Sequence, residues 1–139
     1  MSGPVSTAGV VCFRGDEVLL IKRGKPPRLG QWSIPGGRIE WGEAAIAAAR
    51  RELMEETSVE AEILALVDVV DGVFVGDDGQ VERHYVMIDY AARWVSGEPA
   101  AGDDAADARF VPMAQVDAMV EWPETRRVIH EAWARFGDA

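Results

Sequence analysis

The chain has 139 residues, a length typical of one domain with a sizeable core. Hydrophobic residues make up 48% and charged residues 27%, as in ordinary globular proteins, and no apolar run approaches the length of a membrane span. The formal net charge of −10 offers no basic field that could displace counterions, which argues against non-specific nucleic-acid binding.

The cysteine content and the first residues of the chain indicate which cellular compartment to expect. Cys12 is the only cysteine, which excludes an internal disulfide and a cysteine-based zinc site. The segment Met1-Ser2-Gly3-Pro4 lacks the basic and apolar stretches of a signal peptide. We therefore expect a cytoplasmic protein with one domain over residues 1–139 and no membrane partner.

Two apolar runs near the start predict a β-hairpin that feeds a sheet. Residues 5–13 are rich in β-branched and apolar side chains, residues 14–16 suit a turn, and residues 17–22 suit the returning strand. Cys12 falls inside the first run, where a small buried hydrophobe is its expected role.

A basic loop, unusual in this acidic chain, follows at residues 23–30. One interpretation is a solvated loop whose charges aid solubility. The other is a substrate-binding loop in which Arg23, Lys25 or Arg28 reaches the phosphate groups of a ligand. The second interpretation gains weight because this loop leads directly into the turn and the motif described below.

Residues 35–37, Pro-Gly-Gly, predict a tight turn at which the backbone can approach a ligand or metal closely. Trp32 and Trp41 flank this turn. An aromatic ring at either position can stack on a nucleobase, although a tryptophan more often covers the core. We favour core for Trp32 and keep Trp41 as a candidate substrate contact.

A helix is predicted next, because residues 44–49 are acceptable or strong helix formers without glycine or proline. Gly42 can act as its N-cap. Ile46, Ala49 and Leu53 share one apolar face of this helix, which can pack on a sheet.

Three carboxylates, Glu52, Glu55 and Glu56, occupy positions i, i+3 and i+4 of the same helix and fall on another face. Like charges at these spacings repel one another. A divalent cation would reverse that penalty, because Mg²⁺ takes oxygen ligands from a few carboxylates, water and substrate phosphates. For Arg51–Glu56 taken alone, a solvated charged face is the alternative interpretation.

The second half of the chain predicts more strands. Residues 59–70 alternate and then become continuously apolar, as in a strand entering a covered sheet. Residues 76–79, Gly-Asp-Asp-Gly, predict a hairpin turn that joins residues 73–75 to residues 81–94. Residues 96–107 are small, acidic and contain glycine and proline, which is typical of a surface loop.

A short strand at residues 109–111 and two helices complete the chain. Pro112 ends the strand, residues 113–120 predict a short helix, and Pro123 suits the first turn of a C-terminal helix. One face of that last helix is apolar and is expected to pack on the sheet; it consists of Val128, Ile129, Ala132, Trp133 and Phe136.

The stretch Gly37–Val59 resembles the Nudix box of the Nudix hydrolase family. That box consists of Gly, five residues, Glu, seven residues, Arg-Glu, a bulky apolar residue, one residue, Glu-Glu, one residue, Gly and a bulky apolar residue. This chain agrees at every specified position except Ser58, which stands where the family has glycine. Chance agreement in a chain this long is on the order of one in a million. Because that glycine follows the helix end, where left-handed backbone is common, Ser58 leaves the geometry of the following loop open.

The resemblance implies an α/β fold, a Nudix-type α/β/α sandwich with a mixed twisted sheet. It also implies hydrolysis of a pyrophosphate bond in a nucleoside diphosphate linked to another moiety, with Mg²⁺ or Mn²⁺ as cofactor. The implied metal ligands are Glu52, Glu55 and Glu56 with the Gly37 carbonyl, and Glu43 as a ligand or a partner of ligands. The implied catalytic residues are the same three helix glutamates and Arg51, which would orient them through an ion pair.

In relatives of this kind, a carboxylate on a loop outside the box serves as an extra metal ligand or as the general base. The candidates in the acidic loop are Glu98, Asp103, Asp104 and Asp107. A plain solvated loop is the alternative for each of them. The proton acceptor is thus expected to be either a helix glutamate or one of these carboxylates.

The box and the residues that lead into it, 32–37, resemble those of the ADP-ribose or nucleotide-sugar branch of the family. A nucleoside triphosphate pyrophosphatase that releases a monophosphate and pyrophosphate is the alternative. A non-catalytic nucleotide-sensing domain is a third hypothesis, disfavoured because every box carboxylate is present. The expected partner is a small nucleotide, and the protein is expected to be a monomer or a homodimer.

Overall fold

The computed structural model describes residues 3–137, so the part of the signal-peptide expectation that rests on Met1 and Ser2 lies outside it. The elements are, in order, β1 (Val5–Arg14), β2 (Glu17–Arg23), β3 (Trp32–Ser33), β4 (Gly36–Arg38), α1 (Ala45–Thr57), β5 (Glu60–Val75), β6 (Val81–Ser96), β7 (Ala105–Pro112), the 3-10 turn η1 (Met113–Gln115), α2 (Val116–Met119) and α3 (Pro123–Phe136). None of the helices in the described part of the chain has the length and apolar character that crossing a membrane requires.

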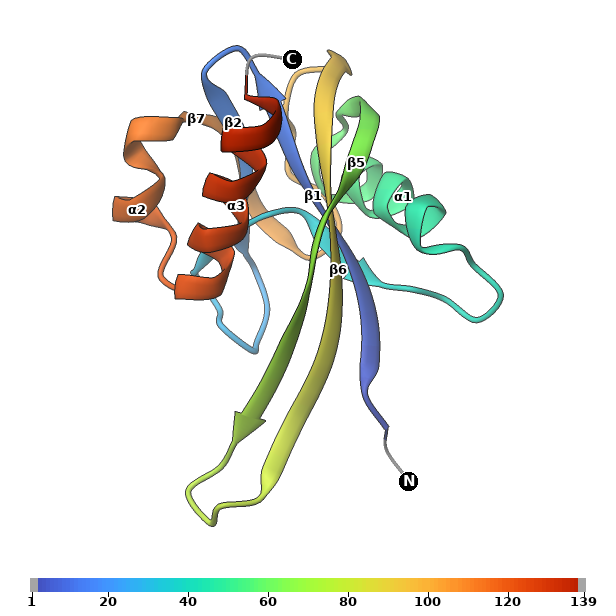
Figure 1. Cartoon of the computed structure of the whole chain (residues 1–139), viewed down its shortest axis with the longest axis vertical. Coiled ribbons are helices and arrows are strands. Elements are labelled where there is room, and N and C mark those ends of the chain that lie inside the picture. The colour runs from blue at the N-terminus through green and yellow to red at the C-terminus, as the bar shows by residue number, and fades with distance from the viewer. Residues whose placement is uncertain (1–2, 138–139) are drawn as a thin grey trace.

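The strands form one mixed, seven-stranded sheet. Its main order is β3-β2-β1-β6-β5, with β4 paired to β1 and β7 paired to β2. The β1–β6 pair is parallel, and the other pairs are antiparallel. Helix α1 lies on one side of the central strands, and α2 and α3 lie on the other (Figure 1). The expected α/β/α sandwich with a mixed twisted sheet is therefore confirmed.

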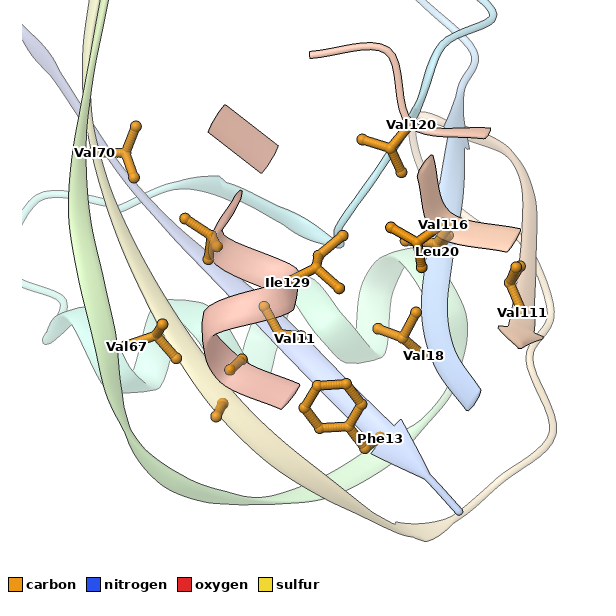
Figure 2. Packing of buried hydrophobic residues seen from close by; sticks show 13 residues of the cluster. Val11, Phe13, Val18, Leu20, Val67, Val70, Val111, Val116, Val120 and Ile129 are labelled. Carbon is orange, nitrogen blue, oxygen red and sulfur yellow. The ribbon is translucent and has the colours of Figure 1, made fainter. Parts of the chain in front are cut away.

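Strands β1 and β2 are buried on both faces, which explains why their sequences are almost continuously apolar. On the face covered by α3, Val11 and Phe13 pack with Ile129, as Figure 2 shows. On the face covered by α1, the cluster contains Ala8, Val10, Cys12, Leu19, Ala48, Ala49, Leu53, Val59 and Ala92. Burying one Val, Leu or Ile side chain contributes roughly 1.5–3 kcal/mol, so alternate residues of β1 stabilise two separate cores.

Both predicted hairpins are present. In the first, Phe13 pairs with Val18 across the turn between β1 and β2. In the second, the apolar stretches on both sides of residue 71 belong to one strand, β5, rather than to two. Four register shifts interrupt its pairing with β6, and such bulges let a long strand bend. The β5–β6 ribbon extends well beyond the helices (Figure 1).

The predicted turn at residues 35–37 is wrong, because Gly36–Arg38 is the short strand β4. Gly36 and Gly37 pair with Gly9 and Ala8 of β1. A Cβ atom on Gly36 would lie 2.6 Å from the Ala8 carbonyl oxygen. Glycine is required here by the close approach of two strands, and not by turn geometry.

The start of α1 also differs from expectation. Its N-cap is Ala44, which makes no side-chain cap, and Gly42 lies in the preceding loop with a positive φ of 84°. Ala49 and Leu53 are buried as predicted, whereas Ile46 is 38% exposed. Ile46, in the first turn of α1, therefore contributes less to the buried face than predicted.

The acidic loop is shorter than predicted, because β7 begins at Ala105 and pairs with β2. Asp107 consequently lies on a strand opposite Lys22. The small and acidic residues at the start of β7 do not favour a strand in the sequence. They form one because they pair with β2. The predicted 109–111 strand is the second half of β7, and Pro112 ends it as expected.

Ser58 adopts the left-handed conformation that the family glycine would occupy, with φ 62° and ψ 15°. Its backbone N–H donates to the Met54 carbonyl oxygen at 3.0 Å, so the helix end is closed in the usual way. Ser58 in place of glycine therefore leaves the loop geometry intact. Its cost in stability is the strain of a side chain in left-handed backbone.

We predict that Ser58→Gly stabilises the protein by about 0.5–1 kcal/mol, because a side chain in left-handed backbone costs roughly 1–2 kcal/mol and glycine's greater unfolded-state entropy offsets part of the gain. Urea unfolding measures the change. Ser96→Gly, at the end of β6, is the matched control and should destabilise. Equal losses for both variants would contradict the strain at Ser58.

Candidate functional site

A cleft of about 440 Å³ lies against the sheet and is bordered by α1 and the start of α3. Glu52 and Glu56 of α1 and Asp103 and Asp104 of the loop before β7 line it, as do Asp89 of β6 and Glu124 of α3. The arginines that line it are Arg23 at the end of β2, Arg28 in the loop that follows, Arg38 of β4 and Arg83 of β6. The cleft therefore combines an acidic cluster with a set of guanidinium groups.

The acidic cluster brings Glu52, Glu55 and Asp103 together, each with a carboxylate oxygen within 4.8 Å of the others. Asp103 reaches the helix because its loop docks on the C-terminal end of α1. The Gly102 N–H donates to the Glu56 carbonyl oxygen at 3.1 Å, and the Ala100 N–H to the Thr57 carbonyl oxygen at 2.9 Å. These bonds satisfy carbonyl groups that a helix end leaves without partners.

The other three loop candidates form ion pairs outside the cluster, although Asp104 also lines the cleft. Glu98 binds Arg14 at 3.0 Å, and Asp104 binds Lys25 at 2.7 Å. Asp107, on β7, pairs with Arg109. The sequence alone did not distinguish the four carboxylates. The docking of the loop on α1 brings only Asp103 of these four into the cluster with Glu52 and Glu55.

Glu52, Glu55 and Asp103 fit a hard divalent cation. Carboxylate oxygens are the ligands that Mg²⁺ and Mn²⁺ prefer, and three of them here lie within reach of one ion. Burial raises the pKa of Glu52, while its hydrogen bond from Arg51 favours the charged form. A bound cation would offset the repulsion within the cluster.

Glu56 is set apart from this group. Its side chain is 4% exposed, and its Oε1 accepts the Gly36 N–H at 2.8 Å, which links α1 to β4. Burial raises the pKa of Glu56 to about 8, against the effect of the Gly36 hydrogen bond. In the metal-free protein this carboxyl group therefore titrates near neutral pH.

Arg51 holds the acidic face in place through its planar fork. Its Nε and Nη2 atoms donate to the two oxygens of Glu43 at 2.8 and 2.9 Å. Its Nη1 donates to Glu52 at 2.9 Å and to Glu55 at 3.3 Å. This is the arrangement through which an arginine can orient catalytic glutamates.

Glu43 contacts the cluster only through Arg51. Both of its oxygens are engaged by that guanidinium group, and one also accepts the Glu40 N–H at 3.0 Å. The Arg51 hydrogen bonds, with the Glu40 N–H, lower the pKa of Glu43 to about 2. Of the two roles predicted for Glu43, the geometry favours the partner of ligands.

Gly37 faces Glu52 directly. A Cβ atom on Gly37 would lie 2.4 Å from Glu52 Cδ, so a side chain at this position would displace the carboxylate. The predicted role of the Gly37 carbonyl as a metal ligand stays a prediction.

The predicted substrate contacts divide into two groups. Arg23 and Arg28 line the cleft. The Lys25 side chain is 68% exposed and paired with Asp104, and Trp41 is 104% exposed on the loop before α1. Neither Lys25 nor Trp41 is among the described residues that line the cleft. Trp32 packs against the core, as favoured from the sequence.

Sequence reasoning missed several cleft residues, among them Arg83, Phe74 and Trp122. The Arg28 guanidinium lies 4.7 Å from the ring centroid of Phe74 and 4.3 Å from that of Trp122. Arg83 also lies over Phe74, and its buried Nε atom has no hydrogen-bond partner within residues 3–137. No spacing rule connects these positions, which meet only because β5, β6 and the start of α3 border one cleft.

Comparison with known proteins finds a matching family, two similar curated proteins and a similar crystal structure. The profile of the NUDIX domain family matches residues 3–132. An ADP-ribose pyrophosphatase of Methanocaldococcus jannaschii is 35% identical over 106 residues, which cover 76% of this chain but only 60% of that protein. A putative 8-oxo-dGTP diphosphatase 2 of Mycobacterium tuberculosis is 37% identical over 107 residues, covering 76% of this chain and 72% of that protein. The crystal structure of a MutT NUDIX hydrolase from Burkholderia pseudomallei has a TM-score of 0.77 and 28% identity, and the match covers 94% of this chain and 98% of that chain.

The raised pKa of Glu56 predicts how stability depends on pH without metal. The folded protein binds more protons than the unfolded chain between pH 4.5, the ordinary value, and about 8. Glu56 therefore stabilises the fold most at low pH, and its contribution is lost as the pH rises to about 8. In EDTA, Glu56→Gln should be more stable than the wild type at pH 8, and the difference should shrink towards pH 5.

Urea unfolding at several pH values measures this difference. Glu60→Gln, which removes an exposed carboxylate of β5, is the control for the loss of a carboxylate away from the cleft. Parallel stability curves for wild type and Glu56→Gln would show that Glu56 is ionised throughout.

Proposed function

The chain belongs to the Nudix family, and from this premise we propose that it hydrolyses the pyrophosphate bond of a nucleoside diphosphate linked to another moiety. The observation that carries the proposal is the meeting of Glu52, Glu55 and Asp103 in a cleft that also contains arginine side chains. ADP-ribose or a nucleotide sugar is the favoured substrate, supported by the similarity to an ADP-ribose pyrophosphatase. Hydrolysis of a nucleoside triphosphate is the alternative, supported by the similarity to a putative 8-oxo-dGTP diphosphatase.

Glu52, Glu55 and Asp103 would hold Mg²⁺ or Mn²⁺, with Glu56 and the Gly37 carbonyl beside them. When bound, such an ion supplies positive charge that lowers the pKa of water and neutralises charge on the phosphates. This explains how a chain with a net charge of −10 can bind a polyanionic substrate.

The residues of the chain itself bind and orient the substrate. Arg23, at the end of β2, and Arg28, in the loop that follows, line the cleft and would donate to phosphate oxygens, where charge-assisted hydrogen bonds are strong. Arg51 keeps Glu52 and Glu55 in a fixed orientation through the bonds described above.

Glu56 is our candidate for the group that takes a proton from the attacking water. It lines the cleft, and the Gly36 N–H holds one carboxylate oxygen, which leaves the other for the proton. Asp103 is the second candidate, because it is the loop carboxylate that reaches the helix.

We predict that the protein converts ADP-ribose into AMP and ribose 5-phosphate in the presence of Mg²⁺ or Mn²⁺, and that EDTA abolishes this turnover. Chromatography of a nucleotide panel identifies the products. A monophosphate and pyrophosphate from triphosphates would favour the alternative substrate. Binding without any metal-dependent product would instead support the nucleotide-sensing hypothesis.

Glu56→Gln tests the residues within the same assay. The variant should fold and should lose most activity on any accepted substrate, because it removes a carboxylate at the reacting centre. Glu60→Gln, an exposed position on β5, is the matched control and should keep wild-type activity. Near-wild-type turnover by folded Glu56→Gln would refute the mechanism.

We predict separately that Arg28→Ala raises KM about tenfold, because one hydrogen bond to a charged group contributes roughly 1.5–3 kcal/mol. Steady-state kinetics on the accepted substrate provides the measurement. Arg50→Ala removes an exposed arginine of α1 and should leave KM unchanged. An unchanged KM for folded Arg28→Ala would place the phosphates elsewhere in the cleft.

A further inference from the structure

One buried carboxyl group of the cleft has no role in the scheme above. Asp89 lies on β6 on the same face as Met87 and Tyr85, which also line the cleft. It is only 7% exposed. In the parallel pairing it lies opposite Gly9, where an added Cβ would be 2.6 Å from Asp89 Oδ1. Gly9 thus makes room for the Asp89 carboxyl group.

The Asp89 carboxyl group makes no side-chain hydrogen bond or ion pair with any residue between 3 and 137. Burial raises its pKa to about 7; the charge of Asp68 raises it further and that of Arg127 lowers it. Its oxygens are not among the fully buried side-chain atoms that lack a partner within residues 3–137, so they are open to the cleft that Asp89 lines. A ligand in the cleft can therefore hydrogen-bond to them.

The surroundings of Asp89 suit a flat heterocycle. Val70, Met87 and Ile34 provide apolar side chains in the same cleft, and the nearly buried Thr125 of α3 adds a hydroxyl group. Sites of this kind, apolar with a few placed polar groups, fix the orientation of small ligands. A nucleobase has apolar faces and a hydrogen-bonding edge, which matches this combination.

The other aromatic part of the cleft is less available to a base. Arg28 already covers the rings of both Phe74 and Trp122, at 4.7 and 4.3 Å from their centroids. A base stacking on either ring would first have to displace that guanidinium group. The apolar surface beside Asp89 carries no such cover among the contacts within residues 3–137.

We propose that Asp89 is a specificity-determining residue that hydrogen-bonds the edge of a purine base in the substrate. The proposal rests on the proposed function only in taking a nucleotide as the ligand, and the substrates named for both relatives above are purine nucleotides. An ionised carboxyl group accepts the ring N–H and the amino group of guanine. A protonated one accepts the adenine amino group and donates to the adjacent ring nitrogen.

Equilibrium binding of AMP, GMP and ribose 5-phosphate, measured by calorimetry, tests the assignment without requiring turnover. The wild type should bind at least one of the two purine nucleotides more tightly than ribose 5-phosphate, by about 10-fold to 100-fold. Asp89→Leu should lose this preference and keep its affinity for ribose 5-phosphate. Asp89→Asn, with one acceptor and one donor group, can pair with the edge of either purine and should keep part of the preference.

Asp71→Asn, at an exposed position of β5, is the control for charge and should bind all three ligands as the wild type does. Asp89→Leu should also melt at or above the wild-type temperature, because an apolar side chain replaces a nearly buried carboxyl group. A wild type without purine preference, or an Asp89→Leu variant that retains it, would overturn the proposal.

The two proposals fail in different ways. If no nucleotide is hydrolysed but purine preference depends on Asp89, the proposed function is wrong and the role of Asp89 stands. If ADP-ribose or a triphosphate is hydrolysed and Asp89→Leu discriminates AMP from ribose 5-phosphate as the wild type does, the role of Asp89 is wrong.

Discussion

The ion pairs of Arg51 are the interaction on which the acidic site depends. Three carboxylates on one helix face would repel one another, and a fourth, from a loop, adds to that repulsion. Arg51 donates to Glu43, Glu52 and Glu55 at once, so one rigid guanidinium fixes the orientation of two cluster members and of the Glu43 side chain that binds it. The cluster is thereby preorganised for a cation.

Glycines near carboxylates are a second constraint. Gly37 leaves the volume that the Glu52 carboxylate occupies, and Gly9 does the same for Asp89. Both glycines lie on paired strands of the sheet, at the wall of the cleft. The sheet can therefore hold a carboxylate close to its backbone without moving the strands apart, and burial then raises the pKa of both groups.

The carboxylate cluster and three arginines of the cleft come from different elements. Helix α1 and the loop docked on its end contribute Glu52, Glu55 and Asp103. The end of β2, the loop after it and strand β6 contribute Arg23, Arg28 and Arg83. A phosphate-bearing ligand can contact guanidinium groups directly and carboxylates through a cation. This separation avoids neutralising the arginines by internal ion pairs, and Arg83 keeps a buried Nε atom without a partner in the described chain.

The sequence by itself determined the features that depend on local spacing. The helical repeat puts Glu52, Glu55 and Glu56 on one face, the two apolar runs at residues 5–13 and 17–22 predict the β1–β2 hairpin, and proline marks the start of α3. The family pattern supplied the role of Arg51, and the left-handed backbone at Ser58 agrees with its position at a helix end.

Only the tertiary structure decided what meets across long stretches of chain. It selected Asp103 among four similar loop carboxylates, turned Gly36 and Gly37 into a strand, and left Trp41 exposed. It also brought Arg83, Phe74 and Trp122 to Arg28, and placed Asp89 against Gly9. These contacts depend on strand register and loop docking, which are set by the packing of the whole sheet, whereas short-range spacing reports only the preferences of one element.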